Sequence, residues 1–163
     1  MRLFLNEGTK TSPQLGAAQP LEANAKAIDG THWGSVLVCD WDRDGRKDLI
    51  LGMGGEGNPS ASYDWPHLSA NPAADHGFLF YRNTGTNAAP VLGRPEWIQA
   101  GGQVISYTRP NLGSFADWDG DGLNDLIACE FENVVWLYLN TGPSGHGMPM
   151  AAGPFLGTTE FTP

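Results

Sequence analysis

Two short acidic loops carry the clearest chemistry in this sequence. Residues 40–48 read DWDRDGRKD and residues 117–125 read DWDGDGLND, and Leu-Ile follows each of them. Neighbouring carboxylates repel one another by about 1 kcal/mol per pair at 4 Å in water, and by about 4 kcal/mol at an effective dielectric constant of 20. Hard oxygen ligands at alternate positions suit Ca²⁺, whereas Mg²⁺ prefers a tighter octahedron that retains waters. The loops therefore predict two calcium sites.

The expected ligands come from alternate positions of each loop. Positions 1, 3, 5 and 9 supply carboxylates and position 7 a backbone carbonyl, while position 6 is the glycine that a sharp turn around calcium requires. The predicted ligands are Asp40, Asp42, Asp44, Arg46 and Asp48 in the first loop, and Asp117, Asp119, Asp121, Leu123 and Asp125 in the second. One such loop could be an ordinary surface turn, but two matched copies favour metal. Side chains fill these positions and leave little room for a catalytic water, so the ion is expected to be structural.

The residues that flank the loops indicate strands rather than helices. An EF-hand closes with Glu at position 12, where this chain has Leu51 and Ala128. Short apolar runs at 35–39 and 49–52, bounded by turn residues, are typical of strands. Each loop is therefore expected to join two strands, with its ninth residue at the start of the second strand.

A second pattern repeats along the chain. Apolar stretches that end in Asn-x-Gly occur at 3–8, 80–85 and 137–142, and this ending is a turn signal. The interval from Asp40 to Asp117 is the same as the interval from Asn6 to Asn83, and we call it the repeat interval. The first unit is longer than the second, and its additional residues lie between Gly52 and Phe78.

Together these pieces resemble the FG-GAP/VCBS repeat of integrin-like β-propellers and many secreted bacterial proteins. The matching segments are 40–50 with 78–83, and 117–127 with 134–140. The resemblance implies four-stranded blades, each with a calcium loop between its first two strands. It spans most of the chain, but the long insertion after Gly52 departs from the repeat, so no function is carried over to the insertion.

The resemblance implies an all-β chain that forms a single β-propeller segment. The expected parts are residues 1–30 as a half blade, 31–110 as a blade with an insertion at 54–77, and 111–163 as a further blade. Closed propellers have about four to eight blades, and about two and a half are present. The chain is thus expected to be a piece of a larger propeller or a homo-oligomer that completes its blades with copies of itself.

Composition supports this class and excludes others. The chain has 163 residues with 22 Gly and 12 Pro and shows no sustained helical periodicity, which favours a turn-rich all-β domain. A net charge of −9 argues against nucleic acid as a partner, and no apolar run is long enough to span a bilayer. The N-terminus has no signal-peptide pattern. By resemblance, the expected setting is extracellular, cell-surface or periplasmic.

The insertion carries the candidate ligand-binding residues. Loops of this length are uncommon unless they are functional or disordered. The candidates combine two aromatic rings, an acid and two imidazoles: Tyr63, Asp64, Trp65, His67 and His76. They suit a carbohydrate or a protein surface, although the aromatic rings could equally pack against the blade. Two alternatives stay open, a polysaccharide-lyase propeller and an architectural self-assembling module; no catalytic residue is assigned.

Two further pairs of residues carry structural expectations. Trp41 and Trp118 occupy the second position of each loop, which points away from a cation, so both are expected to pack between blades. Cys39 and Cys129 lie at non-equivalent positions of the two units and are expected to be buried free thiols, with a disulfide between them as the less favoured alternative.

Overall fold

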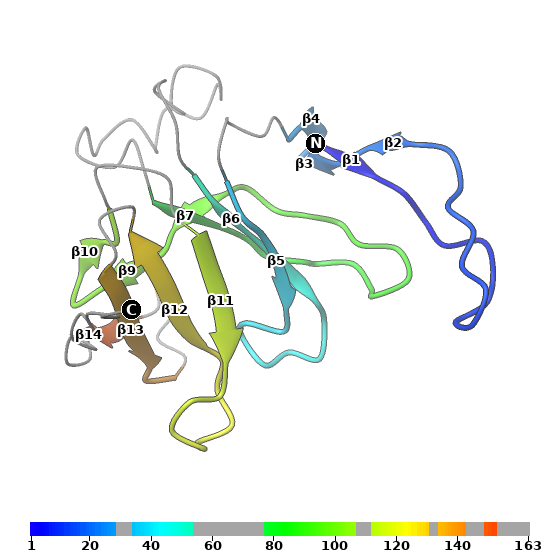
Figure 1. Ribbon diagram of the computed structural model, residues 1–163. Helices are drawn as coiled ribbons and strands as arrows, with labels where there is room; N and C mark the ends of the chain where they lie inside the picture. The colour runs from blue at the N-terminus through cyan, green and yellow to red at the C-terminus, as the bar shows by residue number, and fades with distance from the viewer. Residues whose placement is uncertain (29–33, 54–76, 107–111, 131–133, 143–148, 153–163) are drawn as a thin grey trace, which may run out of the picture.

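The computed structural model describes residues 1–28, 34–53, 77–106, 112–130, 134–142 and 149–152, and it confirms an all-β chain (Figure 1). The strands are β1 (Arg2–Leu3), β2 (Gln19–Pro20), β3 (Glu22–Ala23), β4 (Lys26–Ala27), β5 (Val36–Cys39), β6 (Asp48–Gly52), β7 (Phe78–Tyr81), β8 (Glu96–Trp97), β9 (Gln99–Ala100), β10 (Gln103–Val104), β11 (Leu112–Ala116), β12 (Asp125–Glu130), β13 (Val134–Asn140) and β14 (Pro149–Ala152). Among the described residues, no helix has the length and apolar character needed to cross a membrane.

The first large sheet has four antiparallel strands in the order β5-β6-β7-β8. Its strands are short runs of apolar, β-branched and aromatic residues, such as VLVC in β5 and FLFY in β7, which favour extended backbone. The strands predicted on both sides of the first loop are confirmed. Every residue of β6 and β7 is buried, so these two strands form the centre of the molecule.

The second large sheet has six strands in the order β10-β9-β14-β13-β12-β11. Four strands were expected from residues 111–163, but the β9–β10 hairpin, which follows β8 in the chain, also joins this sheet. Gly101 and Gly102 turn that hairpin with φ angles of 58° and 80°. Its strand β9 then pairs in parallel with β14 and covers an edge that would otherwise be open. Among the described strands no sheet closes on itself.

Two apolar clusters lie on opposite faces of the β5–β8 sheet. Side chains alternate along a strand, so Leu49 and Leu51 enter one cluster while Ile50 between them enters the other. The cluster on the N-terminal side contains Ala23, Ile28, Leu49, Leu51, Met53, Leu79, Tyr81, Leu92 and Trp97. The cluster toward the second sheet contains Trp41, Ile50, Phe78, Phe80, Ile98, Ile105, Leu126, Ala128 and Tyr138. The central sheet is thus buried on both faces.

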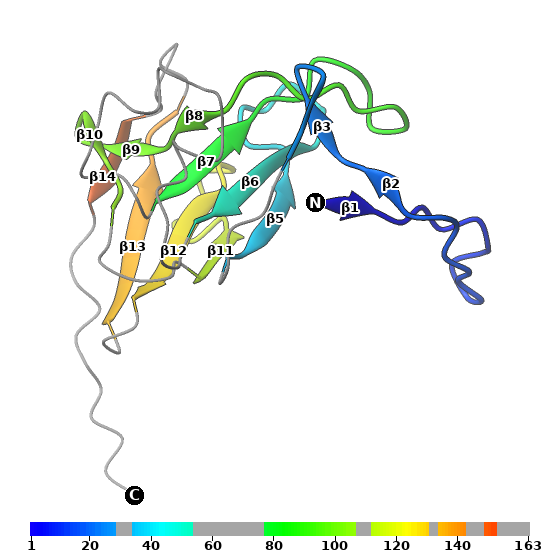
Figure 2. The same cartoon turned by 90° about the horizontal axis from the view of Figure 1, so that it is seen from above.

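The N-terminal segment has the strand pairing of a later part of the chain. Arg2 pairs with Pro20 in β1–β2, and one repeat interval later Leu79 pairs with Trp97 in β7–β8. The hairpins β3–β4 and β9–β10 are related by the same interval. In Figures 1 and 2, β1 and β2 lie on the side of β5 and β6 opposite β11 and β12. Unlike β7–β8, β1–β2 forms a sheet of only two strands among the described residues.

Candidate metal centre

Each acidic loop connects the two strands of an antiparallel hairpin, as predicted. The last strand pair before the first loop is Cys39 with Asp48, and before the second loop it is Ala116 with Asp125. The glycine at position 6 has a positive φ angle in both loops, 84° at Gly45 and 85° at Gly122. A left-handed conformation costs roughly 1–2 kcal/mol for a residue with a Cβ, which explains glycine at this position.

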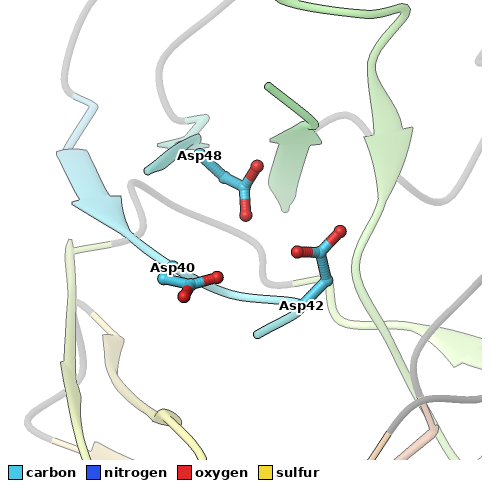
Figure 3. Close-up of side chains that lie close together, drawn as sticks. All are labelled: Asp40, Asp42 and Asp48. Carbon is cyan, nitrogen blue, oxygen red and sulfur yellow. The ribbon is translucent and has the colours of Figure 1, made fainter. Parts of the chain in front are cut away.

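Three carboxylates converge in each loop. One oxygen from each of Asp40, Asp42 and Asp48 lies within 4.8 Å of the other two, and Figure 3 shows the three groups around a common space. Asp117, Asp119 and Asp125 form the corresponding group in the second loop, also within 4.8 Å. Positions 1, 3 and 9 of both loops therefore come together in an arrangement that can hold a metal ion.

The aspartate at position 9 fixes the loop to the sheet. Asp48 is buried, and its two oxygens accept the backbone N–H groups of Trp41 (3.0 Å) and Asn83 (2.8 Å). Asp125 is buried in the same way and accepts the N–H groups of Trp118 (2.7 Å) and Asn140 (2.8 Å). Each of these carboxylates links the start of its loop to the end of the third strand of the sheet.

Burial also changes the acidity of this group in the first loop. Loss of hydration raises the pKa of Asp48, the hydrogen bonds from Asn83 and Trp41 oppose that shift, and the charges of Asp42 and Asp44 add to it. An anion is therefore held at Asp48 at an electrostatic cost that a cation would offset.

The carboxylate at position 1 provides the test of whether a cation fits. Asp40 Oδ2 accepts the N–H of Gly45 (3.0 Å), and Asp117 Oδ2 accepts that of Gly122 (3.1 Å). The other oxygen of Asp40 is buried and has no hydrogen-bond partner. A buried hydrogen-bond acceptor without a partner lowers the stability of the fold. A carboxylate oxygen is a good ligand for a hard cation, which could take the place of the missing hydrogen-bond donor. The residues present therefore fit a cation at this loop.

The acids predicted at position 5, Asp44 and Asp121, are not members of the three-carboxylate groups. Asp44 Oδ1 accepts the N–H of Arg46 (2.8 Å), and Asp121 Oδ1 accepts that of Leu123 (2.7 Å). These hydrogen bonds close the second half of each loop. The role of all four residues as ligands stays a prediction.

Two arginines neutralise part of the first loop. The guanidinium of Arg46 forms an ion pair with Asp44, and that of Arg82 forms one with Asp42. The alignment of the two loops places Leu123 at the position of Arg46, and the alignment of Asn83 with Asn140 places Leu139 at the position of Arg82. The second loop thus has apolar residues where the first has cations.

Two asparagines position the loops, a role that the sequence analysis missed. Asn83 is buried; its Oδ1 accepts the N–H of Gly85 (2.9 Å) and its Nδ2 donates to the carbonyl of Lys47 (3.1 Å). Asn140 is buried too, and its Nδ2 donates to the carbonyl of Asn124 (3.2 Å). Both carbonyls belong to position 8 of a loop. The signal was the recurrence of Asn-x-Gly after each loop, which the sequence analysis took as a turn alone.

The expected packing of the two loop tryptophans is confirmed for one of them. Trp41 is 1% exposed and its ring lies 4.8 Å from that of Phe115, in the second sheet. Trp118 is 54% exposed, so the expectation was wrong there. Trp41 is covered because a second sheet packs against its loop, whereas no described segment packs against Trp118 in that way.

Both cysteines are free, as expected, but they differ in burial. Cys39 is half-buried, and burial together with the charges of Asp48 and Asp40 raises the pKa of its thiol to about 12. Cys129 is exposed, so the expectation of a buried thiol was wrong for it. The candidate ligand-binding residues Tyr63, Asp64, Trp65, His67 and His76 lie outside the described residues.

The chain and its structure were compared with known protein families, curated proteins and solved structures. No protein-family model matches the chain, and no curated protein or solved structure matches it either.

Proposed function

We propose that this protein is a calcium-stabilised binding module built from β-propeller-type blades of the FG-GAP/VCBS kind that its sequence resembles. The observation that carries the proposal is the pair of equivalent carboxylate groups, Asp40/Asp42/Asp48 and Asp117/Asp119/Asp125, each with three oxygens within 4.8 Å of one another. The same backbone hydrogen bonds hold both groups at the same end of a β-hairpin. A recurring arrangement of this sort is what a repeated metal site requires.

Calcium is the ion that the donor set favours. All candidate side-chain ligands are carboxylates, and hard oxygen ligands bind Ca²⁺ and Mg²⁺ rather than the softer transition metals. Calcium accepts six to eight oxygens in flexible geometry, and the fifth-position acids and seventh-position carbonyls are close enough in sequence to add to the three converging groups. The buried Asp40 oxygen without a partner supports a cation in the first loop.

The proposed role of the ion is structural. The loops join strands, and Asp48 and Asp125 fasten each loop to the third strand of its sheet. A cation that binds only the folded loops stabilises them by mass action. We propose carbohydrate or a protein surface as the partner, in an extracellular, cell-surface or periplasmic setting, with residues 54–77 as the contact segment.

A second candidate function is that of an architectural module. Trp118 is 54% exposed, and Val36 and Val38 of β5 are 56% and 61% exposed. Apolar side chains at both ends of a stack of sheets favour contact with further sheets of the same kind.

Calorimetric titration tests the proposal. EDTA-treated protein should bind two equivalents of Ca²⁺ and should bind Mg²⁺ more weakly. At a free calcium concentration 100 times the Kd, each site should add about 2.7 kcal/mol to the free energy of unfolding, and the melting temperature should rise by roughly 5–10 °C per site. The matched control is the double variant Asp42→Asn/Asp119→Asn. Identical melting curves in calcium and in EDTA would refute the structural role. Binding to a glycan array without turnover would support the carbohydrate partner.

A further inference from the structure

The N-terminal strands correspond in detail to the second half of the central sheet. Asn6 Oδ1 accepts the N–H groups of Gly8 (3.0 Å) and Gln14 (2.9 Å). One repeat interval later, Asn83 Oδ1 accepts those of Gly85 (2.9 Å) and Val91 (3.0 Å). The long turn after β1 is therefore the turn after β7 repeated, with the same pair of hydrogen bonds.

Strands equivalent to β5 and β6, which pair beside β7 in the central sheet, are not found beside β1 among the described residues. Strand β7 pairs with β8 on one edge and with β6 on the other. Strand β1 pairs with β2 alone in the described part of the chain. Phe4, at the position of Tyr81, is 50% exposed, whereas Tyr81 lies opposite Leu49 of β6 and is 1% exposed. An edge strand with an apolar residue beside it is thus open for pairing.

The outer face of β5 also lacks a packing partner among the described residues. Val36 and Val38 are more than half exposed, while their counterparts on β11, Gly113 and Phe115, are half-buried. Phe115 is covered by Trp41 from the preceding acidic loop, and the N–H of Gly113 donates to Ser35 Oγ (3.3 Å). A side chain added at Gly113 would meet Phe78 and Leu37 of the preceding sheet. The face of β11 is covered by a strand–loop–strand hairpin, and no hairpin among the described residues covers the same face of β5.

We propose that the open edge of β1 and the Val36/Val38 face together bind a β-hairpin of the kind formed by β5, its acidic loop and β6, supplied by a polypeptide segment outside residues 1–163. The second strand of that hairpin pairs antiparallel with β1, which is strand addition to a free edge. Its loop tryptophan covers Val38 as Trp41 covers Phe115. Asn6 is equivalent to Asn83, whose backbone N–H donates to Asp48 of the first loop. The N–H of Asn6 is therefore placed to donate to the ninth residue of an acidic loop in the bound hairpin. The inference does not depend on metal binding.

The chain itself supplies a probe for this site. In the first large sheet Leu51 pairs with Leu79, and in the second Ala128 pairs with Trp136. Arg2 lies four residues before Asn6, just as Leu79 and Trp136 lie four residues before Asn83 and Asn140. A second copy of residues 112–134 joined directly before Met1 of the full chain therefore has the natural spacing for its second strand to pair with β1. The readout is the alkylation rate of Val38→Cys in a Cys39→Ser/Cys129→Ser background, with the copy of Cys129 in the added hairpin also replaced by Ser.

The fused hairpin should slow alkylation of Val38→Cys at least tenfold relative to the unfused chain, in calcium and in EDTA alike. In the matched control, the tryptophan of the fused copy is replaced by Ala, and most of the protection should be lost. Should the fusion fail to fold by circular dichroism, the same hairpin with its ends joined by a disulfide, added in trans, gives the same readout.

Unchanged alkylation with both forms of the hairpin would overturn the proposal. Protection of the unfused chain that grows with its own concentration would also overturn it, because the face would then belong to a second copy. If calcium binds nowhere but the fusion still protects Val38→Cys, the proposed function fails and this inference stands. A rise from two to three bound Ca²⁺ in the fusion would support both.

Discussion

The two acidic loops share a hydrogen-bonded frame and differ in how their charge is balanced. In both, the ninth residue accepts two backbone N–H groups and a buried asparagine holds the carbonyl of position 8. In the first loop Arg46 and Arg82 pair with Asp44 and Asp42. The second loop has leucines at both places. The frame thus sets where the carboxylates converge, and the neighbouring arginines balance part of the negative charge in the first loop alone.

The arginines act in opposite directions with and without metal. Without a cation they reduce the repulsion among the carboxylates of the first loop. With a cation present, Arg82 competes for Asp42, a carboxylate that the ion also needs. Arg82 is about half exposed, and pairs of this kind contribute about 0–1 kcal/mol. We therefore expect the second loop to bind calcium somewhat more tightly and to lose more order without it.

The largest expected effect tests the shared frame. Asp125→Ala leaves the N–H groups of Trp118 and Asn140 without their acceptor, at about 1–3 kcal/mol each when buried. The free energy of unfolding should fall by roughly 2–6 kcal/mol in urea titrations even in EDTA, and Asp48→Ala should do the same to the first loop.

The control for this prediction is Asp119→Ala, which should be close to neutral in EDTA and destabilising only in calcium. If Asp125→Ala causes no loss in EDTA and loses only as much as Asp119→Ala in calcium, position 9 acts only through the metal.

A reciprocal exchange sharpens the difference between the loops. Arg82→Leu gives the first loop the residue of the second, and its calcium affinity should rise by up to about fivefold, the equivalent of about 1 kcal/mol. Leu139→Arg should lower the affinity of the second loop by a similar factor. Calorimetry should be done with the other loop inactivated by Asp119→Asn or Asp42→Asn. Affinities that do not change in either loop would remove the arginines from the comparison.

The smallest expected effect is a shift in the pH dependence of the first loop. Its cause is the raised pKa of Asp48, which keeps its proton to a higher pH than an ordinary carboxyl group. Calcium needs the carboxylate, so affinity in the Asp119→Asn protein should decline as the pH falls from about 7 toward the carboxyl range. In metal-free protein the sign is reversed: the contribution of Asp48 to stability is present below its unfolded pKa and is lost as pH rises through its folded pKa.

Asp44→Asn provides the control for the pH prediction. It removes one of the charges that raise the pKa of Asp48, so the decline in calcium affinity should begin at a lower pH in Asp44→Asn/Asp119→Asn than in Asp119→Asn. The same onset in both proteins would assign the pH dependence to burial and the charge of Asp42, and not to Asp44.

The parts of the fold that the sequence predicted are those with local causes. The all-β class, the strands beside the first loop and the convergence of positions 1, 3 and 9 follow from residue types within a few positions of one another. The asparagine contacts and the Arg82 pair of the first loop join residues that are far apart in the chain, and no local pattern indicates them. The exposure of Trp118 and the sheet chosen by β9–β10 were missed because they depend on which segments pack together.

The alternation along β6 and β7 has a consequence for how the molecule comes apart. Leu49 and Leu51 belong to one apolar cluster and Ile50 to the other. Strand β6 therefore contributes side chains to both clusters. Unfolding of β6 would expose both apolar clusters to water at the same time. Denaturation should accordingly be a single cooperative transition that includes the N-terminal hairpins and the second sheet, and not a stepwise loss from either end.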